Sequence, residues 1–128
     1  MHWEQVLKMT EILIISHSSE IAQGTSALVS QMAGDTIIHA SGGVDGGIGT
    51  NIDQINDMIG KVGADTICFY DIGSSRMNLE MAVEMYDGEH ELHISEAPIV
   101  EGAFLAAVEN SVGSSTEAIL EKLDTMKK

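Results

Sequence analysis

The sequence is poor in aromatic side chains, in basic side chains, in proline and in cysteine. Aromatic residues make up 4% of its 128 residues, which is too few for a surface on which bases or sugar rings stack. Twenty acidic residues stand against six basic ones, for a formal net charge of -14. This balance excludes a nucleic-acid partner, because binding to a phosphate backbone depends on clustered Lys and Arg. We expect a protein partner with a basic docking face instead.

The single cysteine, Cys68, stands in the apolar run Ile67 to Tyr70. In such a run we expect a buried thiol, and not a metal ligand or a nucleophile. No apolar run approaches the roughly 20 residues of a membrane span, and the N-terminus lacks a basic region followed by an apolar one. The sequence therefore predicts a cytoplasmic protein that does not associate with membranes.

The composition predicts one globular domain. With 44% hydrophobic residues, the chain is large enough to bury one core and too small to need two. Residues 1–8 hold the only tryptophan and precede Met9, which stands just ahead of the first apolar run and could be an alternative translation start. We expect residues 1–8 to be a leader, either disordered or a start-site extension, and residues 9–128 to form the domain.

Short apolar strands alternate with helical patterns along the chain, which is typical of βαβ units around a parallel sheet. Strands are predicted at residues 11–16, 35–40, 65–70 and 89–94. The first and third are nearly continuous apolar runs, as central strands are. The second and fourth carry His39, His90 and His93, which we expect to be exposed on edge strands. Their scatter does not indicate a metal site.

Helical spacing follows the first two strands. The first helix is predicted after Ser18 and Ser19 and ends at Gly34 as its C-terminal cap. Its apolar face is predicted from Ile21, Thr25, Leu28, Val29 and Met32. The second helix is predicted to open at Thr50, with Asp53 in the capping-box position, and to end at Gly63.

Three more helices are predicted in the second half of the chain. One runs from about Met77 to Met85, and the next follows Pro98, a favoured first helical residue. Gly113 interrupts the pattern, and either Ser114 or Ser115 then caps a terminal helix. The whole pattern predicts a three-layer α/β fold, αβα, with a mainly parallel four-stranded sheet.

If the first and third strands are central neighbours, the strand order is 2-1-3-4 and the winding reverses between them. Ligand chemistry in such sheets lies beyond the carboxyl ends of the strands at this switch point. His17 follows the first strand there, while Asp71, Gly73, Ser74 and Ser75 follow the third. The topology therefore predicts that these two distant segments meet at one site.

A histidine at the first turn of a helix lies near backbone N–H groups and the positive end of the helix dipole. This environment suits a neutral imidazole at His17 and an incoming anion, with the Ser18 hydroxyl as a further donor. Such an imidazole can attack a phosphoryl group, and Asp71 could hold the proton of the other ring nitrogen. The alternatives are that His17 only caps the helix and that Asp71 is only a turn residue.

Residues 41–50 form a glycine-rich loop that ends at a predicted helix start. It could cradle a phosphate, and Thr50 could contribute a hydroxyl. It matches neither the Walker nor the Rossmann pattern, so no nucleotide cofactor is expected. The loop could also fold over the site at His17, contact a partner, or be a mobile surface loop.

Four segments together carry a family resemblance. They are Ile-Ser-His-Ser at 15–18, Gly-Gly-Val-Asp-Gly-Gly-Ile-Gly-Thr at 42–50, Tyr-Asp-Ile-Gly-Ser-Ser at 70–75 and Ala-Pro-Ile-Val-Glu-Gly-Ala at 97–103. In this order they resemble the DhaM family, the phosphotransferase subunits of phosphoenolpyruvate-dependent dihydroxyacetone kinases. These subunits are related to the mannose-type EIIA domains of the sugar phosphotransferase system.

The resemblance implies an EIIA-mannose-like fold in which His17 is the phosphoacceptor. Asp71, the candidate orienting residue, matches the Asp at the end of the third strand of mannose-type EIIA domains in position only. The phosphocarrier HPr, charged by enzyme I, would donate the phosphate. ADP held by DhaL would accept it, while DhaK binds dihydroxyacetone. Our candidates for contact with the phosphate are Ser18, Thr50, Gly73, Ser74 and Ser75. No cofactor or metal is implied. Mannose-type EIIA domains pair, which implies a homodimer.

Three points remain open at the level of the sequence. The segment after Asp71 is one residue shorter than in sugar-type EIIA domains, which favours DhaM over a mannose-family sugar component. Whether Ser74 or Ser75 faces the phosphate is undecided. A different class is also possible, namely a binding module that keeps the fold while His17 is structural.

Larger DhaM members carry HPr-like and enzyme-I-like domains in the same chain. Here we expect separate proteins to provide the functions of those domains.

Overall fold

A computed structural model describes residues 9–127. In this range the chain forms a four-stranded sheet of order β2-β1-β3-β4, in which each neighbouring pair is parallel. The strands are β1 (Glu11–Ser16), β2 (Ile38–Gly42), β3 (Thr66–Tyr70) and β4 (Leu92–Ile94). The predicted α/β class and the order 2-1-3-4 are confirmed. The leader predicted at residues 1–8 lies outside the described range.

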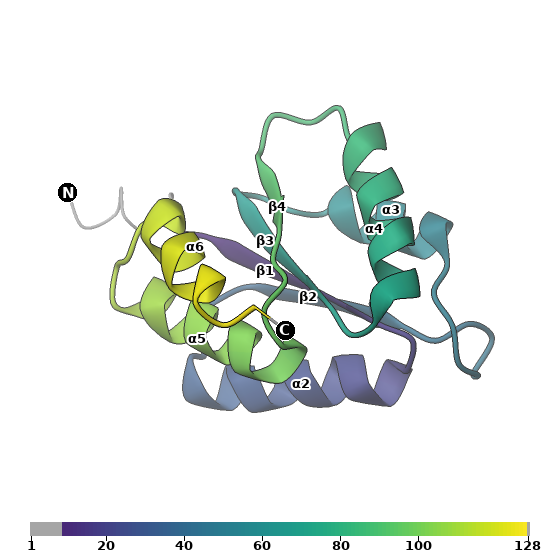
Figure 1. Ribbon diagram of the computed structural model, residues 1–128, viewed down its shortest axis with the longest axis horizontal. Helices are drawn as coiled ribbons and strands as arrows, with labels where there is room; N and C mark the ends of the chain where they lie inside the picture. The colour runs from purple at the N-terminus through teal and green to yellow at the C-terminus, as the bar shows by residue number, and fades with distance from the viewer. Residues whose placement is uncertain (1–8, 128) are drawn as a thin grey trace.

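Helices cover both faces of the sheet, as Figure 1 shows. On one side lie α2 (Ser19–Met32), α5 (Ile99–Ser111) and α6 (Thr116–Asp124). On the other side lie α3 (Ile52–Ile59) and α4 (Gly73–Met85). The three-layer arrangement predicted from the alternating pattern is therefore confirmed.

The central strand β1 contributes to both halves of the core. Ile12 and Ile14 pack in the cluster with α2, α5 and α6, whereas Leu13 and Ile15 pack in the cluster with α3 and α4. Successive side chains of a strand point to opposite faces, so a strand covered on both sides must be apolar throughout. This is why β1 reads as an unbroken hydrophobic run.

Cys68 lies at the centre of β3 and is buried, as predicted. Burial disfavours the thiolate and raises the pKa of this thiol to about 12. The thiol is therefore uncharged at neutral pH. Within residues 9–127, no helix combines the length and the apolar character that crossing a membrane requires.

His39 is not the exposed strand histidine that was predicted. Its side chain is 13% exposed, and its Nε2 lies 2.8 Å from Oε1 of Glu11 on the neighbouring strand. The Glu11 carboxylate also accepts a hydrogen bond from the backbone N–H of Gly63. The sequence pattern missed this pair because the two residues are 28 positions apart and meet only through strand pairing.

The other two histidines lie near β4. His93 is in the strand and pairs with Glu91 at 3.2 Å, while His90 precedes the strand and lies 3.8 Å from Glu89. Both side chains are partly exposed. His90 was predicted inside a strand from residue 89, but the backbone there turns, with Glu91 N–H donating to the carboxylate of Asp65.

Strand β2 is displaced along the chain from its predicted position. It begins at Ile38 and not at Asp35, because the backbone turns before it, with Thr36 N–H donating to the Ala33 carbonyl. It ends at Gly42, where a Cβ atom would lie 2.6 Å from the Ser18 carbonyl oxygen. Only glycine permits this close approach of β2 to the segment that follows β1.

The predicted apolar face of α2 is only partly buried. Its buried residues are Ala22, Thr25 and Val29, whereas Ile21, Leu28 and Met32 are exposed. The helix is capped by Ala33, so the predicted cap at Gly34 was wrong. The spacing identified a helix, but it could not distinguish the face that meets the sheet from an apolar face left in solvent.

The predicted ends of the other helices need three corrections. Helix α3 is capped by Asn51 and not by Thr50, because the Asn51 side chain accepts from the N–H groups of residues 53 and 54. Its C-terminal cap is Gly60 and not Gly63. Helix α4 begins at Gly73, one turn before the predicted Met77.

The last two helices begin where they were predicted. Helix α5 follows Pro98. Ser115, one of the two candidates, caps α6 by accepting from Ala118 N–H at 3.1 Å.

We predict that Glu11→Ala destabilises the fold by about 3 kcal/mol, because it leaves the largely buried His39 ring and the Gly63 N–H without their acceptor. Urea unfolding measures the change. Glu121→Ala, which removes an exposed carboxylate of α6, is the control and should cost less than about 0.5 kcal/mol. Equal losses in the two variants would show that the pair with His39 contributes nothing.

Candidate active site

His17 and Asp71 meet at the carboxyl end of the sheet. His17 is the residue after β1 and Asp71 is the residue after β3, and these strands are neighbours. The His17 Nδ1 atom lies 3.0 Å from Asp71 Oδ1, and the His17 backbone N–H donates to Asp71 Oδ2 at 2.8 Å. The side chains are 17% and 15% exposed. The pair therefore reaches the surface, although most of each side chain is buried.

The Asp71 carboxylate is held by donors on two segments. Oδ1 accepts from the Ser75 hydroxyl and the Ile72 N–H, and Oδ2 accepts from the Ser16 hydroxyl, each at 2.8 Å. Partial burial by itself raises the pKa of Asp71. Hydrogen bonds from the His17 N–H, Ser75, the His17 ring and Ser16 outweigh it, so the pKa lies well below its usual range. Asp71 is therefore ionised at neutral pH.

An ionised Asp71 determines the tautomer of His17. A carboxylate only accepts hydrogen bonds, so the Nδ1 atom that faces it carries the proton. The Nε2 atom of the neutral ring then holds a lone pair. The Ser74 hydroxyl lies 2.6 Å from Nε2 and donates to it. The ring is thus oriented from both sides, with its basic nitrogen toward the first turn of α4.

The two serines after Gly73 differ in what they contact. Ser74 is exposed and touches the His17 ring. Ser75 is fully buried, and its hydroxyl lies 2.8 Å from Asp71 Oδ1 and 2.6 Å from the Ile72 carbonyl oxygen. The Ser74 hydroxyl therefore contacts Nε2 of His17, whereas the Ser75 hydroxyl holds the Asp71 carboxylate.

Ser18 and Thr50 are both engaged in local structure. The Ser18 hydroxyl caps α2 by accepting from Ile21 N–H at 3.3 Å. The Thr50 hydroxyl accepts from the Asn78 side chain at 2.7 Å and so joins the loop before α3 to α4. Within residues 9–127, neither hydroxyl is hydrogen bonded to the His17 ring. Of the residues predicted at the site, Asp71 and Ser74 contact the His17 ring. Ser18 and Thr50 are instead bonded to neighbouring segments.

The glycine-rich loop is an ordered hairpin attached to His17. Val44 and Gly47 pair across a two-residue turn in which Asp45 has a φ of 50° and Gly46 a φ of 80°, as a type I′ turn requires. Gly49 N–H donates to the His17 carbonyl at 2.7 Å. The Asp-Gly dipeptide at 45–46 is a sequence signal for this hairpin.

Arg76 was also missed as a residue of this region. It lies on α4 two residues after Ser74, but its guanidinium pairs with Glu80 and Glu96, each at 3.2 Å. It also lies over the Tyr70 ring, 5.8 Å from its centroid. These partners hold the one basic side chain of α4.

The sequence also matches a known protein family. A family model described as the PTS system fructose IIA component, EIIA-man, matches residues 11–120. The chain belongs to this family. This EIIA chain is also 41% identical over 117 residues to the PTS-dependent dihydroxyacetone kinase phosphotransferase subunit DhaM of Lactococcus lactis subsp. lactis strain IL1403, covering 90% of this chain and 94% of that protein.

A second relative has the same name. The phosphoryl donor subunit DhaM of PEP-dependent dihydroxyacetone kinase 2 from Listeria innocua serovar 6a is 42% identical to the EIIA chain over 121 residues, covering 90% of this chain and 97% of that protein. Among solved structures, EF1359, a protein of unknown function, superposes with a TM-score of 0.84 at 31% identity, covering 94% and 97% of the two chains. The resemblance of the EIIA chain to the DhaM family is confirmed.

We predict that Asp71 stabilises the EIIA fold in a pH-dependent way. Its pKa is depressed in the folded state, so its contribution is complete above its ordinary pKa of about 3.9 and is lost as the pH falls toward the folded-state value. Asp71→Asn lacks this contribution at every pH. The difference in unfolding free energy between wild type and variant should therefore shrink between pH 5 and pH 3.

Urea unfolding of both proteins at pH 7, 5 and 3 measures this difference. Comparison at the same pH cancels the titration of all other groups. A difference that stays constant from pH 7 to pH 3 would contradict the depressed pKa.

Proposed function

We propose that this chain is the phosphohistidine carrier of a phosphoenolpyruvate-dependent dihydroxyacetone kinase. It accepts a phosphoryl group on His17 from HPr and passes it to ADP bound by DhaL, while DhaK binds dihydroxyacetone. The observation that carries the proposal is the His17 ring, held by Asp71 at Nδ1 and by Ser74 at Nε2. The names of the relatives support the assignment of the pathway.

The reactive atom in this proposal is Nε2 of His17. Its lone pair attacks the phosphorus atom of the donor's phosphohistidine, so that a new N–P bond forms while the donor's N–P bond breaks. The Nδ1 proton stays on the ring, which becomes positively charged, and the Asp71 carboxylate at 3.0 Å offsets that charge. In the second half, an oxygen of the terminal phosphate of ADP attacks the phosphorus and His17 leaves as the neutral ring.

The surroundings of Nε2 suit a phosphoryl group. The ring lies between the first turns of α2 and α4, whose leading N–H groups have no acceptor within their own helices. We propose that the Ser74 hydroxyl moves from Nε2 to a phosphoryl oxygen, and that the Gly73 N–H is a further donor. Ser75 positions Asp71, Ser18 caps α2, and Thr50 fixes the adjacent loop.

The chain is, in this proposal, a phosphotransferase in its own right, because it forms and breaks a covalent bond to phosphorus. It acts in the cytoplasm, where HPr and enzyme I supply the phosphoryl group. Its net charge of -14 suits a basic docking face on HPr.

A mannose-family sugar component would share the chemistry at His17, but it would deliver the phosphoryl group to an EIIB protein.

We predict that incubation with phosphoenolpyruvate, enzyme I and HPr adds one acid-labile phosphate to the wild-type chain and none to His17→Ala. Intact-mass spectrometry measures the gain. Adding DhaL with ADP should then remove the phosphate, whereas adding a sugar EIIB should not. The carrier proposal fails if HPr becomes charged and the wild type gains no phosphate, or if His17→Ala gains it equally.

We further propose that the chain acts as a homodimer that pairs through the exposed side of α2. This side carries Ile21, Leu28 and Met32, and the only charged residue of the helix is Glu20. Two copies with a net charge of -14 repel each other over most of their surfaces. An uncharged apolar stripe is a surface where they can approach without placing acidic groups together.

We predict that light scattering gives a mass of twice 13.7 kDa for the wild type and a single-chain mass for Leu28→Glu, because a buried unpaired carboxylate opposes pairing. Val112→Glu adds the same charge at an exposed apolar position after α5 and should remain dimeric. A dimeric Leu28→Glu protein would exclude α2 as the interface, and a monomeric wild type would exclude the homodimer.

A further inference from the structure

Helix α4 leaves a row of methionines in solvent. Met77, Met81 and Met85 are 66%, 51% and 64% exposed, and their spacing of four residues places them along one side of the helix. The opposite side of α4 packs on the sheet through Ser75, Leu79 and Ala82. We call Met77, Met81 and Met85 the methionine row.

The methionine row begins at the reactive histidine. Ser74, which lies 2.6 Å from His17 Nε2, stands three residues before Met77, so it shares that side of the helix. Two more apolar side chains, Ile72 and Ile48, are exposed on the loops at His17. Exposed apolar side chains gathered at one site indicate an interaction surface, and methionine adapts readily to a partner.

Acidic side chains border the methionine row. Glu80 and Glu84 are exposed on α4, and Asp53 and Asp57 are exposed on the adjacent helix α3. Arg76, the only basic residue in these two helices, is paired with acidic partners. An apolar strip with acidic borders is complementary to an apolar surface with Lys and Arg at its edges. A second copy of this chain would instead bring the same acidic borders against it.

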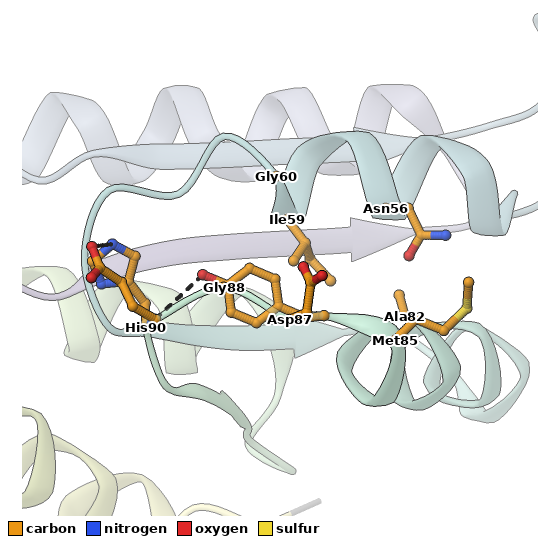
Figure 2. Close-up of a pocket in the computed structure, with 10 residues that line it drawn as sticks. Asn56, Ile59, Gly60, Ala82, Met85, Asp87, Gly88 and His90 are labelled. Carbon is orange, nitrogen blue, oxygen red and sulfur yellow. Dashed lines mark hydrogen bonds and ion pairs between the residues drawn. The ribbon is translucent and has the colours of Figure 1, made fainter.

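The row ends at a cavity of about 480 Å³ between α3 and the segment that follows α4. Figure 2 shows Met85 and Asn56 toward one end of this cavity and His90 at the other. Asp87 and Glu89 line it as well. A basic or apolar side chain of a partner that lies along α4 could enter this cavity at the end of the row.

We propose that the methionine row is the docking surface for the protein that donates the phosphoryl group to His17, and that this protein presents an apolar helix edged by Lys and Arg. From Ser74 to Met85 the surface is about 16 Å long, at 1.5 Å per helical residue, so it accommodates about three turns of a partner helix. This inference rests on the carrier function proposed for His17. It assigns recognition of the donor protein to side chains that take no part in the phosphoryl transfer itself.

The test compares a protein donor with a small one. Phosphorylated HPr and phosphoramidate are each supplied as the phosphoryl donor to His17, and intact mass follows both rates. In the double variant Met77→Gln/Met81→Gln the side chains keep their length and helix propensity but become polar. We expect the ratio of the HPr rate to the phosphoramidate rate, at low donor concentration, to fall about tenfold, which corresponds to about 1.4 kcal/mol of lost binding.

The matched control is Ile37→Gln/Val112→Gln, which alters two exposed apolar residues outside α4 and should keep the wild-type ratio. Met77→Leu/Met81→Leu, which retains the apolar surface, should also keep it. A wild-type ratio in the Gln variant of the methionine row would overturn the docking proposal. Failure of the wild type to react with either donor would instead reject the carrier function.

Discussion

The site depends on one carboxylate that joins two segments 54 positions apart. Asp71 accepts hydrogen bonds from Ser16 and His17 at the carboxyl end of β1, and from Ile72 and Ser75 on its own segment. These bonds hold the ends of β1 and β3 in register and keep the carboxylate ionised. The orientation of the imidazole, its tautomer and the placement of the first turn of α4 all follow from this one interaction.

Much of this arrangement could be predicted because it follows from sheet topology. Two unbroken apolar strands must be central, and in a parallel sheet their carboxyl ends lie together, so the meeting of His17 and Asp71 needed no motif. The assignment of Ser74 and Ser75 could not be predicted in this way. It depends on where α4 begins, and the hydroxyls that usually mark a helix start are used here to hold the site.

Two of the other errors show what local periodicity leaves out. Glu11 and His39 meet only because β1 and β2 pair, and local periodicity carries no trace of this contact. The apolar residues of α2 were correctly identified as helical, yet Leu28 and Met32 face solvent. Hydrophobicity alone cannot distinguish a helical residue that packs on the sheet from one that is exposed to solvent.

The burial of Cys68 makes the single thiol of the chain a reporter of its motions. The side chain packs in the cluster beneath α3 and α4, and the thiolate that reagents attack is almost absent while it stays there. A thiol reagent can therefore modify the protein only when this layer separates from the sheet. The rate of modification would measure how often the helix that carries Ser74 comes away, and whether phosphate on His17 or a bound partner holds it in place.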